Sequence, residues 1–268
     1  LTWNNSNILE KCLASVNKID RDNLKISIVD NCSTDNTSSM LSDKFPDYSV
    51  ITNKQNLRYA GGYNSALTQI VFSENEYIIL LNDDTIVSID FIDELISPLL
   101  KDKKSIISVP KILYASNINK IWYAGGKVNL WSGIINHVGI RDFDGPKYSF
   151  INETDYATGC CFCIKYTDFK KLNFFDLDFN MYCEDVDLSL RAKSLNRTII
   201  YNPKSIILHR VSQSLGEHSF QKNKLKLQSQ LKLFWKHASG IQLLSISIYW
   251  ILIHLPYQFI RWLYLREK

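Results

Sequence analysis

Strong charge imbalance, internal repeats and low-complexity linkers are all absent from this sequence of 268 residues. The formal net charge is only +4, so electrostatics do not require a nucleic-acid partner. With 46% hydrophobic and 22% charged residues, the composition is that of a globular protein. Because no repeat or linker divides it, the chain is predicted to form one large domain, to about residue 220, with an appendage.

A disulfide framework and a zinc-ribbon pattern are also missing. The sequence has six cysteines, and they lie in apolar or strand-like contexts. One Cys-X-X-Cys pair, Cys160 and Cys163, has no second pair to complete a zinc site, so it is interpreted as part of a buried strand. This cysteine usage favours a reducing compartment.

The dinucleotide motif Gly-X-Gly-X-X-Gly is absent as well. Gly61 and Gly62 lie in a predicted turn from Asn56 to Asn64, but their spacing does not match it. Paired glycines still let the backbone approach a ligand closely, and Arg58 offers a planar fork for a base carbonyl or a phosphate.

An initiator Met and a visible signal peptide are lacking too. Residues 1–3 have the character of a strand end, so we expect that the sequence starts inside the first strand. Apolar runs then alternate with helical patterns: strands are predicted at 25–30, 48–52 and 77–81, and helices at 8–16, from about 37, and at 63–72. This βαβαβ order predicts a parallel sheet, with ligands at the carboxyl ends of its strands. Residues 106–156 are predicted to form short strands and turns that frame an acceptor.

Two adjacent carboxylates, Asp83 and Asp84, follow the apolar run from Tyr77 to Leu81. Hard oxygen ligands at a strand end suit Mg²⁺ or Mn²⁺, which can bridge a carboxylate to a diphosphate. The alternative is that Asp84 or Thr85 caps a helix from about residue 89.

Three further patterns place polar side chains at element ends. Asp30 ends a strand and can accept from a base N–H, although turns of this kind are common after strands. Glu184 and Asp185 begin a predicted helix, where backbone N–H groups can hold a carboxylate ionised, or the two acids merely cap it. His209 ends another strand and is either structural or a metal ligand. Asp187 and Arg191, four residues apart, predict an ion pair.

These motifs, in this order and spacing, resemble the family 2 glycosyltransferases, especially the rhamnosyltransferase-like members. The matching segments are residues 29–35, 56–64, 81–85, 159–162, 182–191 and 201–209. The resemblance implies a GT-A fold, a Rossmann-like and mostly parallel α/β sheet flanked by helices. It further implies inverting transfer of a sugar from a nucleotide-diphosphate donor, such as dTDP-rhamnose or a UDP-sugar.

By the family pattern, Asp185 is the catalytic base, with Glu184 beside it, and Asp84 and His209 hold Mg²⁺ or Mn²⁺. The resemblance assigns the nucleotide to Thr2, Asn4, Asp30, Asn56, Arg58, Gly62, Asn64 and Asp83. The sequence departs from the pattern at Asn82, which replaces the first acid of Asp-X-Asp, and at Arg58, where relatives often have glycine.

The chain is thus divided into a nucleotide-binding half, residues 1–105, an acceptor and catalytic half, residues 106–220, and a basic, then apolar helical tail, residues 221–268. The uninterrupted apolar part of the tail has about 15 residues, short of the roughly 20 that span a bilayer. Aromatic and basic flanks favour a helix pair lying on the cytoplasmic face of the cell membrane, although packing on the domain or on a second subunit of a homo-oligomer is the alternative.

The predicted partners are a nucleotide-sugar donor, a glycan or lipid-linked acceptor in cell-surface polysaccharide synthesis, and the membrane surface, without nucleic acid. Two other functions were weighed. A sugar-1-phosphate nucleotidyltransferase would need a glycine-rich, basic phosphate loop near the N-terminus, which is not seen. A catalytically inactive membrane assembly partner is disfavoured because Asp84 and Asp185 are both present.

Overall fold

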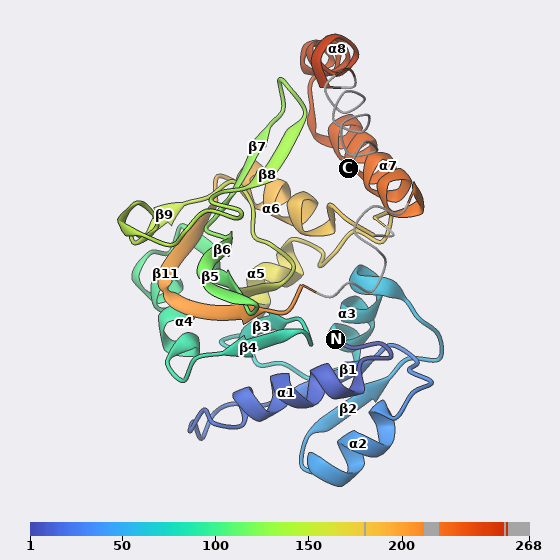
Figure 1. The fold of residues 1–268 in the computed structure, drawn as a ribbon, viewed down its shortest axis with the longest axis vertical. Coiled ribbons are helices and arrows are strands. Elements are labelled where there is room, and N and C mark those ends of the chain that lie inside the picture. The colour runs from blue at the N-terminus through green and yellow to red at the C-terminus, as the bar shows by residue number, and fades with distance from the viewer. Residues whose placement is uncertain (180, 212–219, 255, 257–268) are drawn as a thin grey trace.

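A computed structural model of the chain describes residues 1–179, 181–211, 220–254 and 256 (Figure 1). A seven-stranded mixed sheet forms its centre, with the order β3-β10-β5-β11-β4, while β6 pairs with β5 and β9 with β11. The strands are β3 Tyr77–Leu81, β4 Thr85–Val87, β5 Ser105–Tyr114, β6 Asn117–Tyr123, β9 Asn152–Glu153, β10 Cys161–Lys165 and β11 Thr198–His209. Two smaller ladders join β1 (Ser27–Asp30) to β2 (Ser49–Thr52) and β7 (Gly126–Asn129) to β8 (Ile134–His137).

The alternation of strands and helices predicted for the first hundred residues is present, but the sheet is not mostly parallel. Among the described ladders, β1 with β2 and β5 with β11 are parallel. Strand β10 runs antiparallel to both of its neighbours, β3 and β5, and β11 runs antiparallel to β4. The prediction was wrong because βαβ units build only the first part of the chain, whereas β10 returns from the loop-rich region and inserts between two earlier strands.

Eight helices are described. They are α1 Ser6–Val16, α2 Thr37–Lys44, α3 Arg58–Gln69, α4 Phe91–Lys101, α5 Tyr166–Lys171, α6 Glu184–Ser194, α7 Phe220–His237 and α8 Gly240–Tyr249, with a 3₁₀ turn at Pro146–Tyr148 and a π-helical turn at Trp250–His254. Helix α3 starts five residues earlier than predicted, so the paired glycines lie in its first turns and not in a loop. Strand β4 separates Asp84 from α4, so the helix-cap interpretation of Asp84 and Thr85 is also wrong.

The core lies between the central sheet and the helices on its faces. Strands β5 and β10 are buried along nearly their whole length, as expected for apolar runs covered on both sides. Leu95 of α4 and Ile107 of β5 are fully buried, and burial of each such side chain stabilises the fold by about 1.5–3 kcal/mol. All six cysteines are free, and five of them are buried, in accord with a structural role.

The C-terminal helices pack against the rest of the molecule. Leu233 and Phe234 of α7 are buried, and so are Ile246 of α8 and Trp250 after it. The indole N–H of Trp250 donates to the carbonyl oxygen of Ser132 in the β7–β8 connection, at 3.1 Å. Figure 1 shows this hairpin reaching toward α7 and α8.

Among the described residues, none of the helices combines the length and the apolar character needed to cross a membrane. The aromatic and basic flank predicted for residues 257–268 lies outside the described part of the chain.

Candidate active site

The acidic end of β3 meets the end of β11. Asp84, in the connection to β4, is buried, and its Oδ2 lies 3.2 Å from Nε2 of His209. Their meeting follows from the antiparallel β4–β11 ladder, in which His209 pairs with Thr85. The backbone N–H of Arg210 also donates to the carbonyl oxygen of Asp84, at 2.7 Å. The two predicted metal ligands, 125 residues apart, are therefore brought together.

The donor set at this point fits a divalent cation. His209 Nδ1 is buried without a hydrogen-bond partner, and buried Asp84 Oδ1 lies 3.2 Å from His209 Nε2 but forms no hydrogen bond. The described residues contain no cluster of three or more His, Cys, Asp or Glu side chains suited to a metal. Two protein ligands still suit Mg²⁺ or Mn²⁺, which commonly bind through one or two side chains together with substrate phosphates and water.

Aromatic rings pack beside His209 of the Asp84–His209 pair. The Trp122 ring packs edge-on against His209, with 4.3 Å between centroids, and contacts His137 on its other side. Burial lowers the pKa of His137 to about 4, and its Nδ1 lies 2.6 Å from the hydroxyl of Tyr156. These residues were not predicted as part of the site, because a tryptophan in a loop-rich segment gives no indication of its tertiary neighbours.

Asp83 faces the N-terminal segment. The hydroxyl of Thr2 donates to Asp83 Oδ2 at 2.6 Å, and Thr2 also forms a parallel bridge with Asp30. Burial raises the pKa of Asp83 above its usual range, although the Thr2 hydrogen bond opposes the rise. Thr2 therefore connects two other predicted nucleotide-binding residues, Asp30 and Asp83, and Asp83 directly precedes Asp84 of the candidate metal pair.

Two other predicted nucleotide contacts organise the turns beside Asp30. Asn4 accepts through Oδ1 from the backbone N–H of Thr34, at 2.6 Å, and Asp30 accepts from that of Ser33, at 3.0 Å. Asn56 Oδ1 accepts from the side chain of Asn31. These contacts fix the turns after β1 and before α3.

The remaining predicted nucleotide contacts have different surroundings. Arg58 is exposed, with φ of 59°, at the first position of α3. A Cβ on Gly62 would come within 2.6 Å of Leu1, so this glycine allows α3 to pack on the N-terminal segment. Asn64 forms two hydrogen bonds with the backbone of Phe175. The close approach expected for Gly62 is thus made by protein atoms, and Asn64 joins the two halves of the molecule.

Glu184 and Asp185 form the start of α6, as predicted. Asp185 Oδ2 accepts from the N–H of Gly159 at 2.7 Å, and Oδ1 accepts from the N–H of Val186 at 2.8 Å. Burial raises the pKa of Asp185 more than these two hydrogen bonds lower it. Burial, followed by the nearby charge of Asp185, raises the pKa of Glu184 to about 8. Desolvation therefore outweighs the N–H groups at the helix start in setting the pKa of both acids.

Gly159 connects Asp185, the predicted base, to the segment that carries Asp84, a predicted metal ligand. Its N–H binds Asp185, its carbonyl oxygen accepts from the hydroxyl of Tyr59 at 2.6 Å, and the carbonyl oxygen of the next residue, Cys160, accepts from the N–H of Asn82. A Cβ on Gly159 would lie 2.9 Å from the Tyr59 hydroxyl oxygen. One stretch of backbone therefore connects the strand end that carries Asp84 to the carboxylate of Asp185. Tyr59 was not predicted, since its role depends on this contact alone.

The predicted ion pair of α6 is present: Arg191 Nε lies 2.8 Å from Asp187 Oδ2. The described contacts of this pair are not with Gly159 or Asp84. Arg191 also donates to the carbonyl oxygen of Phe174, and Asp187 also pairs with Lys236.

Two solved structures with a similar fold are those of glycosyltransferases. A crystal structure of GalNAc-T7 with UDP, GalNAc and Mn²⁺ superposes with a TM-score of 0.66 at 17% identity, covering 84% of this chain and 44% of that one. The mannosyltransferase PcManGT from Pyrobaculum calidifontis, in complex with GDP-Man and Mn²⁺, gives a TM-score of 0.64 at 15% identity, covering 96% and 69%. The fold is therefore the GT-A fold that the resemblance implied.

Two similar proteins are rhamnosyltransferases. The rhamnosyltransferase WbbL of Escherichia coli is 28% identical over 142 residues, which are 51% of this chain and 53% of that protein. The N-acetylglucosaminyl-diphospho-decaprenol L-rhamnosyltransferase of Mycobacterium tuberculosis is 21% identical over 233 residues, 78% of this chain and 73% of its own length. The chain thus spans about half of the first relative and about three quarters of the second.

The sequence model of the family described as "Glycosyl transferase family 2" matches residues 1–172. This range contains β3, Asp84 after it, and Gly159, and it stops before α6. Because the match covers well over half of the sequence, the chain belongs to glycosyl transferase family 2.

Proposed function

We propose that this protein transfers a sugar, with inversion, from a nucleoside-diphosphate donor to a hydroxyl of a glycan or lipid-linked acceptor. The observation that carries the proposal is the connection through Gly159 between two carboxylate sites of different character. One is the Asp84–His209 pair, with its unsatisfied buried atoms, and the other is Asp185. An inverting transfer needs one group for the diphosphate and another for the acceptor proton.

Asp84 and His209 are the residues that would hold Mg²⁺ or Mn²⁺. A bound cation of this kind neutralises the charge that develops on the leaving diphosphate. Thr2 and Asp83 sit beside the pair and, with Asp30 and the exposed Arg58, would orient the nucleotide. The structural relatives were solved with UDP or GDP-Man and Mn²⁺, which supports a nucleotide donor and a divalent ion for this chain.

Asp185 would act as the general base. Its carboxylate takes the proton of the acceptor hydroxyl, the hydroxyl oxygen forms a bond to the anomeric carbon, and the bond between that carbon and the diphosphate oxygen breaks with its electron pair. Burial raises the pKa of Asp185, and a base is most effective when its pKa lies near the working pH. The N–H groups of Gly159 and Val186 fix the direction of the carboxylate.

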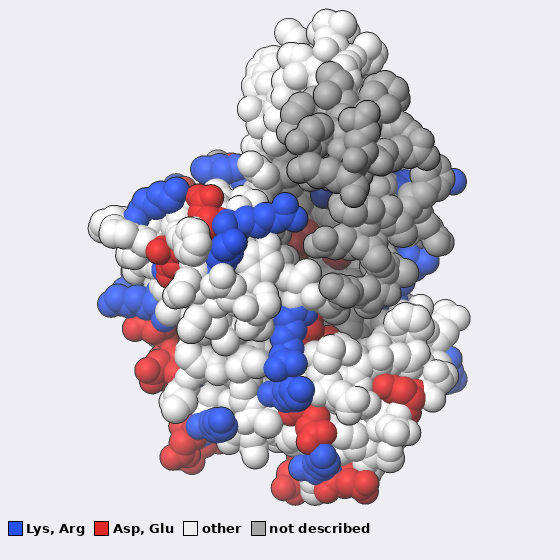
Figure 2. All heavy atoms as spheres, in the orientation of Figure 1, with Lys and Arg blue, Asp and Glu red and all other residues white. Residues whose placement is uncertain are grey.

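The acceptor would be held at a membrane surface, on its cytoplasmic face. Helix α8 buries Ile246 but leaves Ile241, Leu244 and Ile248 more than half exposed, and an apolar groove runs between α8 and Trp131. Figure 2 shows the described atoms of α8 as an uncharged surface at the top of the view. Large exposed apolar patches of this kind mark sites of protein or membrane contact. The relative from M. tuberculosis is named for a diphospho-decaprenol acceptor, which supports a lipid-linked acceptor here.

The function is tested with a panel of nucleotide sugars. A donor stabilises the folded state in proportion to its affinity, so the true donor should raise Tm most, and only with Mg²⁺ or Mn²⁺ present. That donor is then assayed for metal-dependent hydrolysis and for transfer to membrane lipid extracts. His209→Ala should weaken the metal requirement of donor binding. A wild-type protein that binds and hydrolyses none of the donors would contradict the proposal.

A further inference from the structure

Helix α7 forms hydrogen bonds with the segment that leads into α6, the helix that carries Asp185. We call residues 172–179 and 181–183 the α5–α6 segment. The hydroxyl of Ser229 donates to the carbonyl oxygen of Met181 at 2.7 Å, and Nζ of Lys232 donates to that of Asp178, also at 2.7 Å. These side chains lie about one turn apart on a single face of α7, as spacings of three and four residues require. The helix therefore holds this segment by its backbone.

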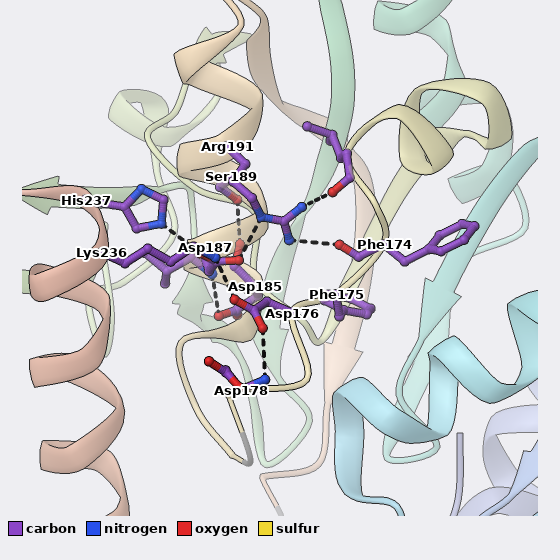
Figure 3. Close-up of polar contacts among 12 residues, drawn as sticks. Phe174, Phe175, Asp176, Asp178, Asp185, Asp187, Ser189, Arg191, Lys236 and His237 are labelled. Carbon is purple, nitrogen blue, oxygen red and sulfur yellow. Dashed lines mark hydrogen bonds and ion pairs between the residues drawn. The ribbon is translucent and has the colours of Figure 1, made fainter.

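One turn further along, α7 binds α6 itself. Asp187 is fully buried and accepts from three side chains: Arg191 of its own helix at 2.8 Å, Lys236 at 2.6 Å and His237 at 2.7 Å (Figure 3). Burial opposes the ionisation of Asp187, but the hydrogen bonds from His237 and Lys236, with the charge of Arg191, lower its pKa to about 2. Lys236 also pairs with Asp176 of the α5–α6 segment, at 2.7 Å.

The other side of the α5–α6 segment is held as well. The guanidinium of Arg191 donates to the carbonyl oxygens of Leu172 and Phe174, and Asn64 of α3 binds the backbone of Phe175 on both its N–H and its carbonyl oxygen. The described part of the segment is thus fixed from α3, α6 and α7 together.

Two residues just before Asp185 have a backbone conformation that needs this support. Tyr182 and Cys183 have φ of 70° and 66°, and Asp185 follows two residues later. Side chains other than glycine rarely adopt this left-handed conformation, and it persists only where the surroundings over-determine it. Ser229 binds the residue immediately before this pair, and Lys236 and His237 bind the residue two places after the base.

We propose that Ser229, Lys232, Lys236 and His237 are positioning residues, which clamp the α5–α6 segment and the start of α6 so that Asp185 points at the acceptor hydroxyl. This inference rests on the proposed function. None of these four side chains contacts Asp84, His209 or Asp185 among the described contacts. The clamp therefore acts on the direction of the base and leaves the donor site intact.

The test uses the full chain and two independent ways of loosening the clamp. Ser229→Ala combined with Lys232→Ala removes two bonds to carbonyl oxygens and leaves Asp187 paired. Lys236→Ala removes the ion pairs, and Lys236→Arg restores a cation there. The matched control is Lys224→Ala, at an exposed position of the same helix. Hydrogen exchange of the α5–α6 segment is measured together with kcat, acceptor KM and the Kd of the nucleotide sugar that the wild type uses.

Both loosened variants should exchange faster in the α5–α6 segment and lose about 10- to 100-fold in kcat, since a misplacement of about 1 Å can cost 100-fold. The Kd of the donor should change less than about twofold, because each tenfold change in affinity needs about 1.4 kcal/mol at the donor site itself. Lys236→Arg should recover most of kcat, and Lys224→Ala should match the wild type.

The inference would be overturned by exchange that stays at the wild-type rate in both variants, or by a kcat that is unchanged although the segment exchanges faster. Loss of donor affinity in step with kcat would also overturn it, since the variants would then have damaged the whole domain. A wild-type protein without transfer activity refutes the proposed function instead, and exchange still decides whether α7 holds the segment.

Discussion

Replacement of the base, Asp185→Asn, is the sharpest test of the chemistry. The variant keeps the shape of the side chain but cannot take up the acceptor proton. General-base catalysis contributes about 100- to 10,000-fold, so the expected loss of kcat corresponds to roughly 2.7–5.4 kcal/mol of transition-state stabilisation. Donor binding should survive, because the residues proposed to bind the nucleotide lie at the ends of β1 and β3 and not at Asp185.

The structure also predicts a second effect of this substitution. The two carboxylate oxygens of Asp185 accept from Gly159 and Val186. An amide has one acceptor oxygen, so one of these N–H groups loses its partner. An unsatisfied buried donor costs about 1–3 kcal/mol. We therefore expect a lower Tm, with the fold retained.

The assay compares kcat for sugar transfer with the Kd of the donor, measured by calorimetry in the presence of Mn²⁺. Glu184→Gln is the control, since it keeps the adjacent side chain uncharged at every pH and leaves both oxygens of Asp185 in place. A variant Asp185→Asn with turnover within about threefold of the wild type would remove Asp185 from the mechanism, because the loss would fall far below the usual contribution of a base. Glu184 would then be the next candidate.

Three further predictions concern the cation, the buried acid and the tail. Asp84→Ala should abolish the effect of Mn²⁺ on donor binding and weaken that binding, as measured by calorimetry; donor binding by the wild type that ignores EDTA would contradict the metal assignment. The pKa of Glu184 is raised to about 8 in the folded state, above the value of about 4.3 in the unfolded state. Between these two pKa values the folded state binds more protons than the unfolded state, so the free energy of unfolding falls as pH rises through this range. In the Glu184→Gln variant, Tm should therefore fall less between pH 5 and pH 9 than it does in the wild type (roughly the window set by those two pKa values). An equal change of Tm with pH in the variant and the wild type would contradict this prediction. Leu244→Glu combined with Ile248→Glu, at positions 61% and 51% exposed, should reduce flotation of the protein with anionic vesicles. Val71→Glu, at an apolar position 93% exposed outside the tail, should not reduce it. Equal flotation of the wild type, the double variant and Val71→Glu would favour the tail as an interface with protein.

The sequence by itself determined the parts of the site that depend on neighbouring residues in the chain. A strand followed closely by Asp83 and Asp84, a helix that begins at Glu184, and the Asp187–Arg191 pair are all local patterns, set by strand and helix periodicity and by the chemistry of element ends. The roles predicted for these residues came from the order and spacing of the motifs, which resemble those of the family.

Only the tertiary structure decided which of these local pieces meet. The directions of β10 and β11 cannot be read from periodicity, which is the same for parallel and antiparallel strands, so the mixed sheet and the pairing of Asp84 with His209 had to be seen. The pKa of Asp185 follows from burial by distant residues, and its direction follows from the N–H of Gly159. The ion pair between Lys236 and Asp187, which are 49 positions apart in the sequence, depends on how α7 packs across α6. Such long-range contacts leave no periodic signal in either segment.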